Sequence, residues 1–133
     1  MISNKIIKIA SDDKFYGLIK DFDYSSTCKN KLCGDIIKIQ IKTIDNKIKT
    51  IRYETDACVF CEASASLISN NFRNFLINDF KKDIESLKKL IKRDHISLPN
   101  KFKKFNQLIK NENKSRFDCI MLPFNAILKA INL

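Results

Sequence analysis

The chain has 133 residues, of which 44% are hydrophobic, with ten Phe and no Trp. This length predicts one domain over residues 1–133, because the chain can bury a core but is short for two. No apolar run approaches the roughly 20 residues that cross a bilayer, and the N-terminus lacks the apolar stretch and cleavage site of a secretory signal. We therefore expect a cytoplasmic protein with no membrane partner.

The net charge of +10 raises the question of nucleic-acid binding, because clustered Lys and Arg neutralise phosphates. The basic residues, however, are spread over almost every segment. The densest runs, Lys88–Arg93 and Lys101–Lys104, fall on helical patterns that also carry apolar residues. A solvated surface is the better interpretation, and we expect no nucleic-acid partner.

Along the chain, the first segment is short. Ile6–Ile9 is apolar and basic, and Ser11–Asp13 predicts a helix N-cap or a turn. Residues 18–28 form a weakly extended pattern. A clear strand follows after Asp35, because three isoleucines alternate with polar residues at Ile37, Ile39 and Ile41.

A second strand is predicted over residues 47–54, joined to the first by a hairpin turn at Asp45-Asn46. Ile51 and Tyr53 share one face of this strand, whereas Ile48 is out of step with Ile51. A β-bulge, or burial on both faces of the sheet, would explain Ile48.

The remaining elements have the spacing of helices. The first helix follows Cys58 and ends near Asn70-Asn71. The second has apolar residues at intervals of three and four, at Leu76, Phe80, Ile84, Leu87 and Ile91. Beyond Pro99, a short helix is marked by Phe102, Phe105, Leu108 and Ile109. The last helix has one apolar face, formed by Phe124, Ile127, Leu128 and Ile131, with Pro123 in its first turn.

Strands followed by helices indicate the α+β class. We expect a small antiparallel sheet of about three strands with helices packed on one face.

Three of the five cysteines fall at the ends of predicted elements. Cys33 precedes the clearest strand, Cys58 lies between a strand and a helix, and Cys119 precedes the last helix. An odd number of cysteines in a chain without an export signal argues against a disulfide framework and for metal or thiol chemistry. At the start of a helix, free N–H groups and the helix dipole favour an anion, so we expect Cys58 to be readily a thiolate.

Loops at element ends commonly lie together, which would bring these three thiols next to Asp35. Gly34, between Cys33 and Asp35, is free to adopt a backbone angle that other residues resist. Three thiolates and a carboxylate would suit Zn²⁺ or an iron–sulfur cluster. Single cysteines at 33, 58 and 119 fit three buried core thiols equally well, so the spacing alone leaves both interpretations open.

Three segments together resemble the U-type iron–sulfur assembly family, which comprises the NifU N-terminal domain, IscU and SufU. They are Cys33-Gly34-Asp35, the stretch Cys58–Ser66 with its Ala-Ser-Ala-Ser ending, and Arg116–Ile127, which carries Cys119. The likeness runs from about Asp12 to the C-terminus. It implies a SufU/IscU-like fold and a metal site formed by Cys33, Asp35, Cys58 and Cys119.

Within this family the chain resembles the SufU branch. The interval between Cys58 and Cys119 is long, as in SufU, which has an extra helical insertion there. Asp118 occupies the position at which IscU has a His, and no Leu-Pro-Pro-Val-Lys motif is present. Arg116 resembles an arginine of SufU and is expected near the metal ligands, outside the ligand set.

The chain also departs from the family at several positions. Asn30 is followed by Lys31 in place of Pro, and Ala57 stands where a Gly usually precedes the second cysteine. The N-terminal helix is shortened to at most residues 2–10. We interpret Cys61 as a small buried residue, Cys28 as a strand residue and His95 as exposed.

The resemblance implies a zinc-bound sulfur acceptor, which would be a zinc-dependent sulfurtransferase partner of a cysteine desulfurase. Cys33 would be the catalytic thiol that accepts the sulfur, and Zn²⁺ would be the cofactor. The alternative is a scaffold that assembles a [2Fe-2S] cluster from iron on the same ligands. Either role implies a cysteine desulfurase of the SufS or NifS type and recipient apo-proteins, or a downstream scaffold, as partners.

Overall fold

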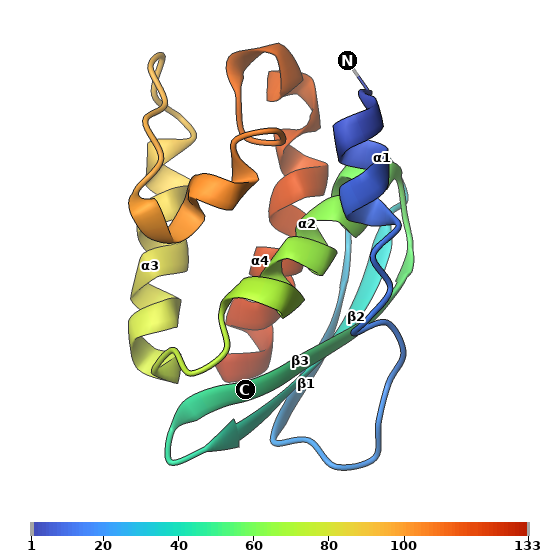
Figure 1. Ribbon diagram of the computed structural model, residues 1–133, viewed down its shortest axis with the longest axis vertical. Helices are drawn as coiled ribbons and strands as arrows, with labels where there is room; N and C mark the ends of the chain where they lie inside the picture. The colour runs from blue at the N-terminus through green and yellow to red at the C-terminus, as the bar shows by residue number, and fades with distance from the viewer. Residues whose placement is uncertain (1, 133) are drawn as a thin grey trace.

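The computed structural model describes residues 2–132 and has the expected α+β architecture. Three antiparallel strands, β1 (Tyr24–Lys29), β2 (Ile36–Ile44) and β3 (Lys47–Asp56), form a sheet in the order β1-β2-β3. Figure 1 shows the longer helices on one side of this sheet. The predicted class, strand number and helical layer are therefore confirmed.

The alternation predicted for the central strand is confirmed. Ile37, Ile39 and Ile41 are completely buried and point into the helical layer. Gln40 lies on the opposite face but is buried as well, and its side-chain oxygen accepts a hydrogen bond from the backbone N–H of Ile19 at 2.8 Å. The polar face of β2 is thus covered at this point by the segment that precedes β1.

The hairpin between β2 and β3 explains the out-of-step isoleucine. Asp45 and Asn46 both have positive φ, as a tight two-residue turn between twisted strands requires. The pairing register then shifts, because Lys42 pairs with Thr50 while the next residue, Thr43, pairs with Ile48. This bulge turns Ile48 to the same buried side as Ile51, so the sequence-based explanation by a bulge is confirmed.

Four α-helices and two short 3₁₀ helices complete the described chain. They are α1 (Asn4–Ala10), α2 (Val59–Asn71), α3 (Ile77–Leu90), η1 (Asn100–Phe105), η2 (Asn111–Arg116) and α4 (Phe117–Ile131). Helix α4 packs on β1 and β2, while α2 packs on β3 and against α4. The three antiparallel strands and these two helices therefore form the frame on which the chemically reactive loops are held.

Of the two alternatives for Ser11–Asp13, the turn is confirmed, because Ser11 ends α1 and the Asp12 carboxylate accepts from the N–H of Lys14 at 3.2 Å. The N-cap of α1 is Ser3, whose hydroxyl accepts from the N–H of Ile6. Two expectations about the last helix need correction. Helix α4 begins at Phe117, which places Cys119 in its first turn and Pro123 in its interior. Pro123 lacks an N–H, so the carbonyl of Cys119 loses its usual partner four residues ahead.

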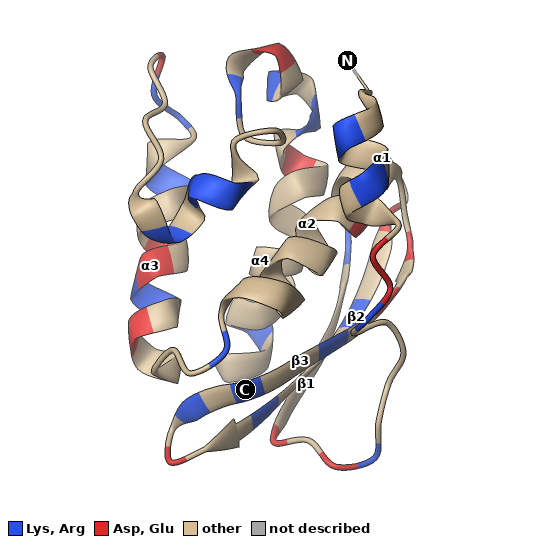
Figure 2. Ribbon diagram, viewed as in Figure 1, with Lys and Arg blue, Asp and Glu red and all other residues tan. Residues whose placement is uncertain are grey.

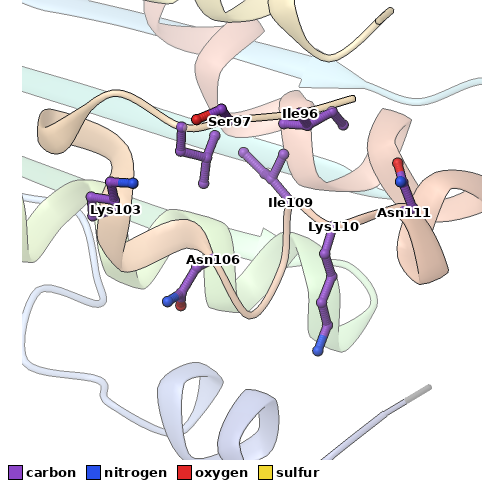
Figure 3. A pocket seen from close by; sticks show the side chains of 8 residues that line it. Ile96, Ser97, Lys103, Asn106, Ile109, Lys110 and Asn111 are labelled. Carbon is purple, nitrogen blue, oxygen red and sulfur yellow. The ribbon is translucent and has the colours of Figure 1, made fainter. Parts of the chain in front are cut away.

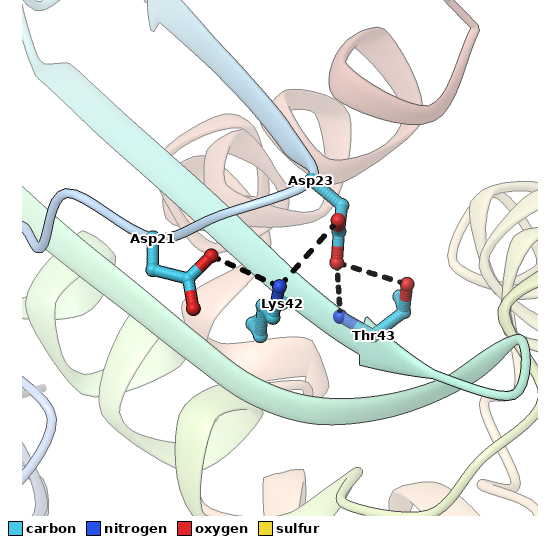
Figure 4. Close-up of polar contacts among 4 residues, drawn as sticks. All are labelled: Asp21, Asp23, Lys42 and Thr43. Carbon is cyan, nitrogen blue, oxygen red and sulfur yellow. Dashed lines mark hydrogen bonds and ion pairs between the residues drawn. The ribbon is translucent and has the colours of Figure 1, made fainter.

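The segment between α1 and β1 is fastened to the sheet by polar contacts. Lys42 of β2 forms ion pairs with Asp21 at 3.0 Å and Asp23 at 3.7 Å, and the second carboxylate also accepts from the backbone N–H and hydroxyl of Thr43 (Figure 4). At the C-terminal end of α4, the Lys129 ammonium donates to the carbonyl of Thr27 in the edge strand β1 at 2.8 Å.

The charges are distributed over helices, strands and loops (Figure 2). Lys and Arg occur on α1, η1, α3 and the β2–β3 hairpin, with acidic residues between them. Within residues 2–132, no helix combines the length and apolar character needed to cross a membrane.

The burial of Tyr53 in β3 can be tested by the pH dependence of the free energy of unfolding. Its side chain is 2% exposed, and burial raises the pKa of its phenol to about 12 from an ordinary value near 10. The folded state therefore favours the neutral phenol, and this contribution is present below pH 10 and lost as the pH rises from about 10 to about 12. We expect wild type to lose about 2–3 kcal/mol more than Tyr53→Phe across this interval. Urea unfolding at each pH gives the free energy of unfolding of both proteins. Equal losses for wild type and Tyr53→Phe would contradict this expectation.

Candidate metal centre

Strand register brings two loops to one end of the sheet. Lys29 pairs with Ile36, and Ile36 pairs with Asp56, so the residues just beyond these strand ends lie next to one another. They belong to the β1–β2 loop, which carries Cys33 and Asp35, and to the β3–α2 junction, which carries Cys58. The predicted meeting of these two loops is therefore a direct consequence of the antiparallel pairing.

The β1–β2 loop is shaped by Asn30. Its side-chain oxygen accepts from the N–H of Leu32 at 3.0 Å, and its carbonyl accepts from the N–H of Gly34 at 2.7 Å. Its own N–H donates to the carbonyl of Asp35 at 2.8 Å. Gly34 has a φ of +78°, as expected from the sequence, and this left-handed angle lets the chain turn between Cys33 and Asp35.

Cys58 occupies the N-cap position of α2, at the predicted strand-to-helix junction. Its backbone N–H donates to Oδ1 of Asp35 at 3.1 Å, which fixes the carboxylate against the start of this helix. Ala57 keeps a φ outside the left-handed region, so the usual glycine is not required here. The small residues Ala63 to Ser66 of α2 are all buried and allow close packing against neighbouring helices.

Helix α4 supplies Cys119. The hydroxyl of Ser64 in α2 donates to the carbonyl of Ile120 at 2.7 Å, which holds the first turn of α4 against α2. The sulfur of Cys119 is then 3.5 Å from the sulfur of Cys33 and 3.9 Å from the side-chain nitrogen of Asn30. Cys33 is exposed, whereas Cys119 is only 4% exposed.

The ligand atoms of Cys33, Asp35 and Cys119 all lie within 4.8 Å of one another. The thiol of Cys58 lies outside this group of three. It is nevertheless close enough to Cys119 to raise the pKa of the Cys119 thiol. Oδ2 of Asp35 is buried and makes no hydrogen bond. A buried carboxylate oxygen without a partner, beside two thiols, fits a divalent metal or an iron–sulfur cluster.

The pKa values differ from the expectation for Cys58. Burial raises the pKa of its thiol, and the N–H groups of Cys61 and Phe60 lower it by less. The pKa of Cys119 is also raised, first by burial and then by the hydrogen bonds of Cys33 and Cys58. The expected thiolate at the helix start is therefore wrong for the metal-free chain, because loss of hydration outweighs the helix N-terminus.

The other singled-out residues are not members of this group of three. Cys61 is completely buried and Cys28 lies in β1, as expected, and burial raises the pKa of both thiols. His95 is exposed. Arg116 is the N-cap residue of α4, and its guanidinium carbon lies 5.9 Å from the centre of the Phe60 ring. It thus contacts α2 next to the cysteines through an aromatic ring and not through a carboxylate.

A cavity of about 410 Å³ lies in a different region, between the segment after α3 and the two 3₁₀ helices (Figure 3). It is lined by Ile96, Ser97, Leu98, Lys103, Asn106, Ile109, Lys110 and Asn111. Lys110 is paired with Glu112 at 2.6 Å. None of its lining residues is a cysteine, and all of them lie between Cys58 and Cys119 in the chain.

Sequence reasoning missed the role of Asn30. It organises the loop by three backbone contacts and also approaches the sulfur of Cys119. An Asn side chain commonly accepts a hydrogen bond from the backbone N–H two residues further on and so closes a turn. The Asn30–Gly34 stretch therefore contained a pattern from which this turn could have been predicted.

The left-handed backbone angle of Gly34 can be tested by two substitutions, because Ala and Asn tolerate this angle to different degrees. A Cβ added at this position would meet no atom within 4 Å, so any cost must come from the left-handed backbone angle. We expect Gly34→Ala to lower the free energy of unfolding by about 1 kcal/mol. Gly34→Asn should cost less, because Asn tolerates this region. Urea unfolding measures both, and equal losses would point to a contact of the added side chain instead.

The comparisons with known proteins agree with this architecture. The family model of the NifU-like N-terminal domain matches residues 1–132. An iron–sulfur cluster assembly scaffold protein IscU from Thermotoga maritima is 26% identical over 132 residues, covering 98% of this chain and 92% of that protein. Two IscU scaffold proteins from Archaeoglobus fulgidus are 30% identical over 82 residues, which is 62% of this chain and 54% of theirs.

Solved structures give the same fold at lower identity. The N-terminal part of a NifU-like protein from Brucella abortus superposes with a TM-score of 0.82 at 20% identity, covering 98% of this chain and 91% of that one. A scaffold protein of the SUF system from Fervidobacterium islandicum AW-1 gives a TM-score of 0.78 at 19% identity, with 98% and 96% coverage. With the family model spanning almost every residue, the chain belongs to the family of NifU-like N-terminal domains.

Proposed function

We propose that this chain is a scaffold on which an iron–sulfur cluster is assembled and then passed to a recipient protein. The observation that carries the proposal is the convergence of Cys33, Asp35 and Cys119, whose ligand atoms lie within 4.8 Å of one another. A relative that aligns over 98% of this chain is named as such a scaffold. The proposal treats residues 1–133 as one domain.

Cys33, Asp35, Cys58 and Cys119 are the proposed ligands of the cluster, which is the cargo of the protein. A carboxylate is a harder ligand than a fourth thiolate and holds a thiophilic metal less firmly, which suits release. Three thiolates and a carboxylate also concentrate negative charge, and Arg116, at the start of α4, is proposed to offset it. A cysteine desulfurase would supply the sulfur, and apo-proteins or a downstream scaffold would receive the cluster.

Anaerobic reconstitution with ferrous iron and sulfide tests this proposal. Wild type should acquire iron, acid-labile sulfide and a visible absorption spectrum, and should then convert an apo-ferredoxin to its holo form. Cys119→Ser should fail to hold the cluster, whereas Cys28→Ser, in a strand outside the site, should behave as wild type. A well-folded wild type that takes up no iron under these conditions would contradict the scaffold function.

A second candidate is a zinc-bound sulfur acceptor of the SufU type. The observation that favours it is the exposure of Cys33, which makes it the accessible thiol beside the buried Cys119 and the half-buried Cys58. Sulfur moves by attack of a thiolate on a persulfide sulfur, so the acceptor must be reachable by the donor protein. Bound Zn²⁺ would keep the neighbouring thiols deprotonated, and the chain would act as a zinc-dependent sulfurtransferase partner of the desulfurase.

Desulfurase turnover with and without the zinc-loaded chain separates the two candidates. Acceptance of sulfur predicts stimulated turnover, with the added sulfur on Cys33 by mass spectrometry. Cys33→Ser should abolish the acceptance of sulfur and largely preserve the fold, while Cys28→Ser and Cys61→Ser should leave acceptance near normal. Sulfur found on Cys61, or stimulation that survives Cys33→Ser, would exclude this assignment.

A further inference from the structure

Two thiols of the site, one accessible and one buried, lie in contact. Cys33 Sγ and Cys119 Sγ are 3.5 Å apart although 86 residues separate them in the chain. Cys33 is exposed and Cys119 is 4% exposed. Formation of a disulfide requires this 3.5 Å gap to shorten to the roughly 2.05 Å of an S–S bond.

The Asp35 carboxylate lies beside this pair. Oδ1 of Asp35 accepts a hydrogen bond from the N–H of Cys58, and the carboxylate lies within 4.8 Å of both sulfurs. The loop that carries Cys33 is thus held against the start of α2, next to Cys119.

We infer that Cys119 is a resolving thiol, which releases the sulfur carried by Cys33 as hydrosulfide. This inference rests on the proposed acceptance of sulfur by Cys33. Cys119 Sγ attacks Cys33 Sγ, the atom that it already contacts, and the bond from Cys33 Sγ to the outer sulfur breaks. The products are a Cys33–Cys119 disulfide and hydrosulfide.

The electrons and the proton balance in this step. The outer sulfur arrives as sulfane sulfur and leaves reduced by two electrons, which the two cysteines supply as they become a disulfide. The proton of Cys119 leaves with the outer sulfur as part of the hydrosulfide. A low-molecular-weight thiol then reduces the disulfide and restores both side chains.

This chemistry explains how a persulfide becomes usable in cluster assembly. The bridging sulfur of a cluster is sulfide, whereas a persulfide delivers sulfur two electrons more oxidised. Cys119 would perform that reduction inside the site. The disulfide also removes two proposed ligands, so the site would hold metal again only after reduction.

A chromogenic disulfide tests the geometry without any partner protein. One equivalent of dithiobisnitrobenzoate is added anaerobically to the metal-free chain, so that exposed Cys33 forms a mixed disulfide and releases one thionitrobenzoate. Attack by Cys119 should release a second equivalent in a first-order phase whose rate does not depend on protein concentration. Peptide mapping should then find Cys33 joined to Cys119.

Two variants and the wild-type map decide between explanations. Cys119→Ser should stop after the first equivalent, and Cys28→Ser, which is half-buried in β1, should follow wild type. If Cys119→Ser fails to fold, the wild-type map alone is decisive. A single equivalent released by wild type, or a bond from Cys33 to Cys58, would overturn the inference.

A sulfur experiment separates this inference from the proposed function. The same proteins are loaded with inorganic polysulfide, desalted and followed for hydrosulfide, and wild type should release it while Cys119→Ser retains cyanide-reactive sulfur. A desulfurase that never loads Cys33 would remove the proposed acceptance of sulfur and leave this result intact. Retention of the sulfur by wild type would overturn the resolving role even if the desulfurase does load Cys33.

Discussion

Removal of bound metal with a chelator is expected to lower the melting temperature of this protein by on the order of 10 °C. The reason is that the proposed ligands lie on three segments that are distant in sequence, around Cys33, Cys58 and Cys119. A metal that joins them binds the folded chain and not the unfolded one, so its binding free energy is added to the free energy of unfolding. Calorimetry of zinc-loaded and chelator-treated protein gives the two melting temperatures.

Matched variants make this result specific to the site. Cys119→Ser should melt at the same temperature with and without chelator, because it lacks a ligand on α4. Cys28→Ser should show the full wild-type shift, because its thiol lies in β1 outside the group of ligand atoms. Metal analysis should find about one ion per wild-type chain. Identical melting curves for loaded and stripped wild type would show that the three segments are not joined by a metal.

Phe72→Ala is expected to lower the free energy of unfolding by about 3–5 kcal/mol. Phe72 is completely buried just after α2 and stacks on Phe80 of α3 with ring centroids 4.5 Å apart. Its ring also lies 5.6 Å from that of Phe102 and 6.2 Å from that of Phe105, both in η1. The substitution would leave a void where α2, α3 and η1 meet, because these segments collapse only partly around a lost ring.

Phe22→Ala is the control for this substitution. Its side chain is 39% exposed, in the segment before β1, so truncation removes far less buried surface. Urea unfolding of both variants, with the slope of the transition compared, reports the two losses. Equal losses of unfolding free energy in the two variants would show that the Phe72 ring does not stabilise the packing of α2, α3 and η1.

The elements with strong local periodicity could be predicted from the sequence. Ile37, Ile39 and Ile41 mark the central strand, and Asp45-Asn46 marks the turn, because both patterns reflect local geometry. Helix α3 is shorter than its spacing suggests, since Leu76 is its N-cap and is 45% exposed. The end of an apolar pattern does not determine where the backbone hydrogen bonds end.

The site could be predicted only in part, because its geometry depends on contacts between distant residues. The sequence indicated which cysteines and which carboxylate to expect, through their positions at element ends and a family resemblance. It did not indicate that Cys58 would lie outside the closest group, that burial would raise its pKa, or that Asn30 would approach Cys119. Each of these depends on how α4 packs against α2 and the sheet, which involves residues about ninety positions apart.

The contact between Lys129 and the edge strand has a consequence for self-association. An edge strand offers unpaired backbone groups to any other extended chain, and such pairing is a common route to aggregation. In β1 the carbonyl of Thr27 already accepts a hydrogen bond from the Lys129 ammonium, and the exposed positions of this strand are Ser25, Thr27 and Lys29. A second strand would have to displace the ammonium and bury a positive charge. Addition of a strand from another copy at β1 is thereby disfavoured, while Cys33 stays exposed at the end of the sheet.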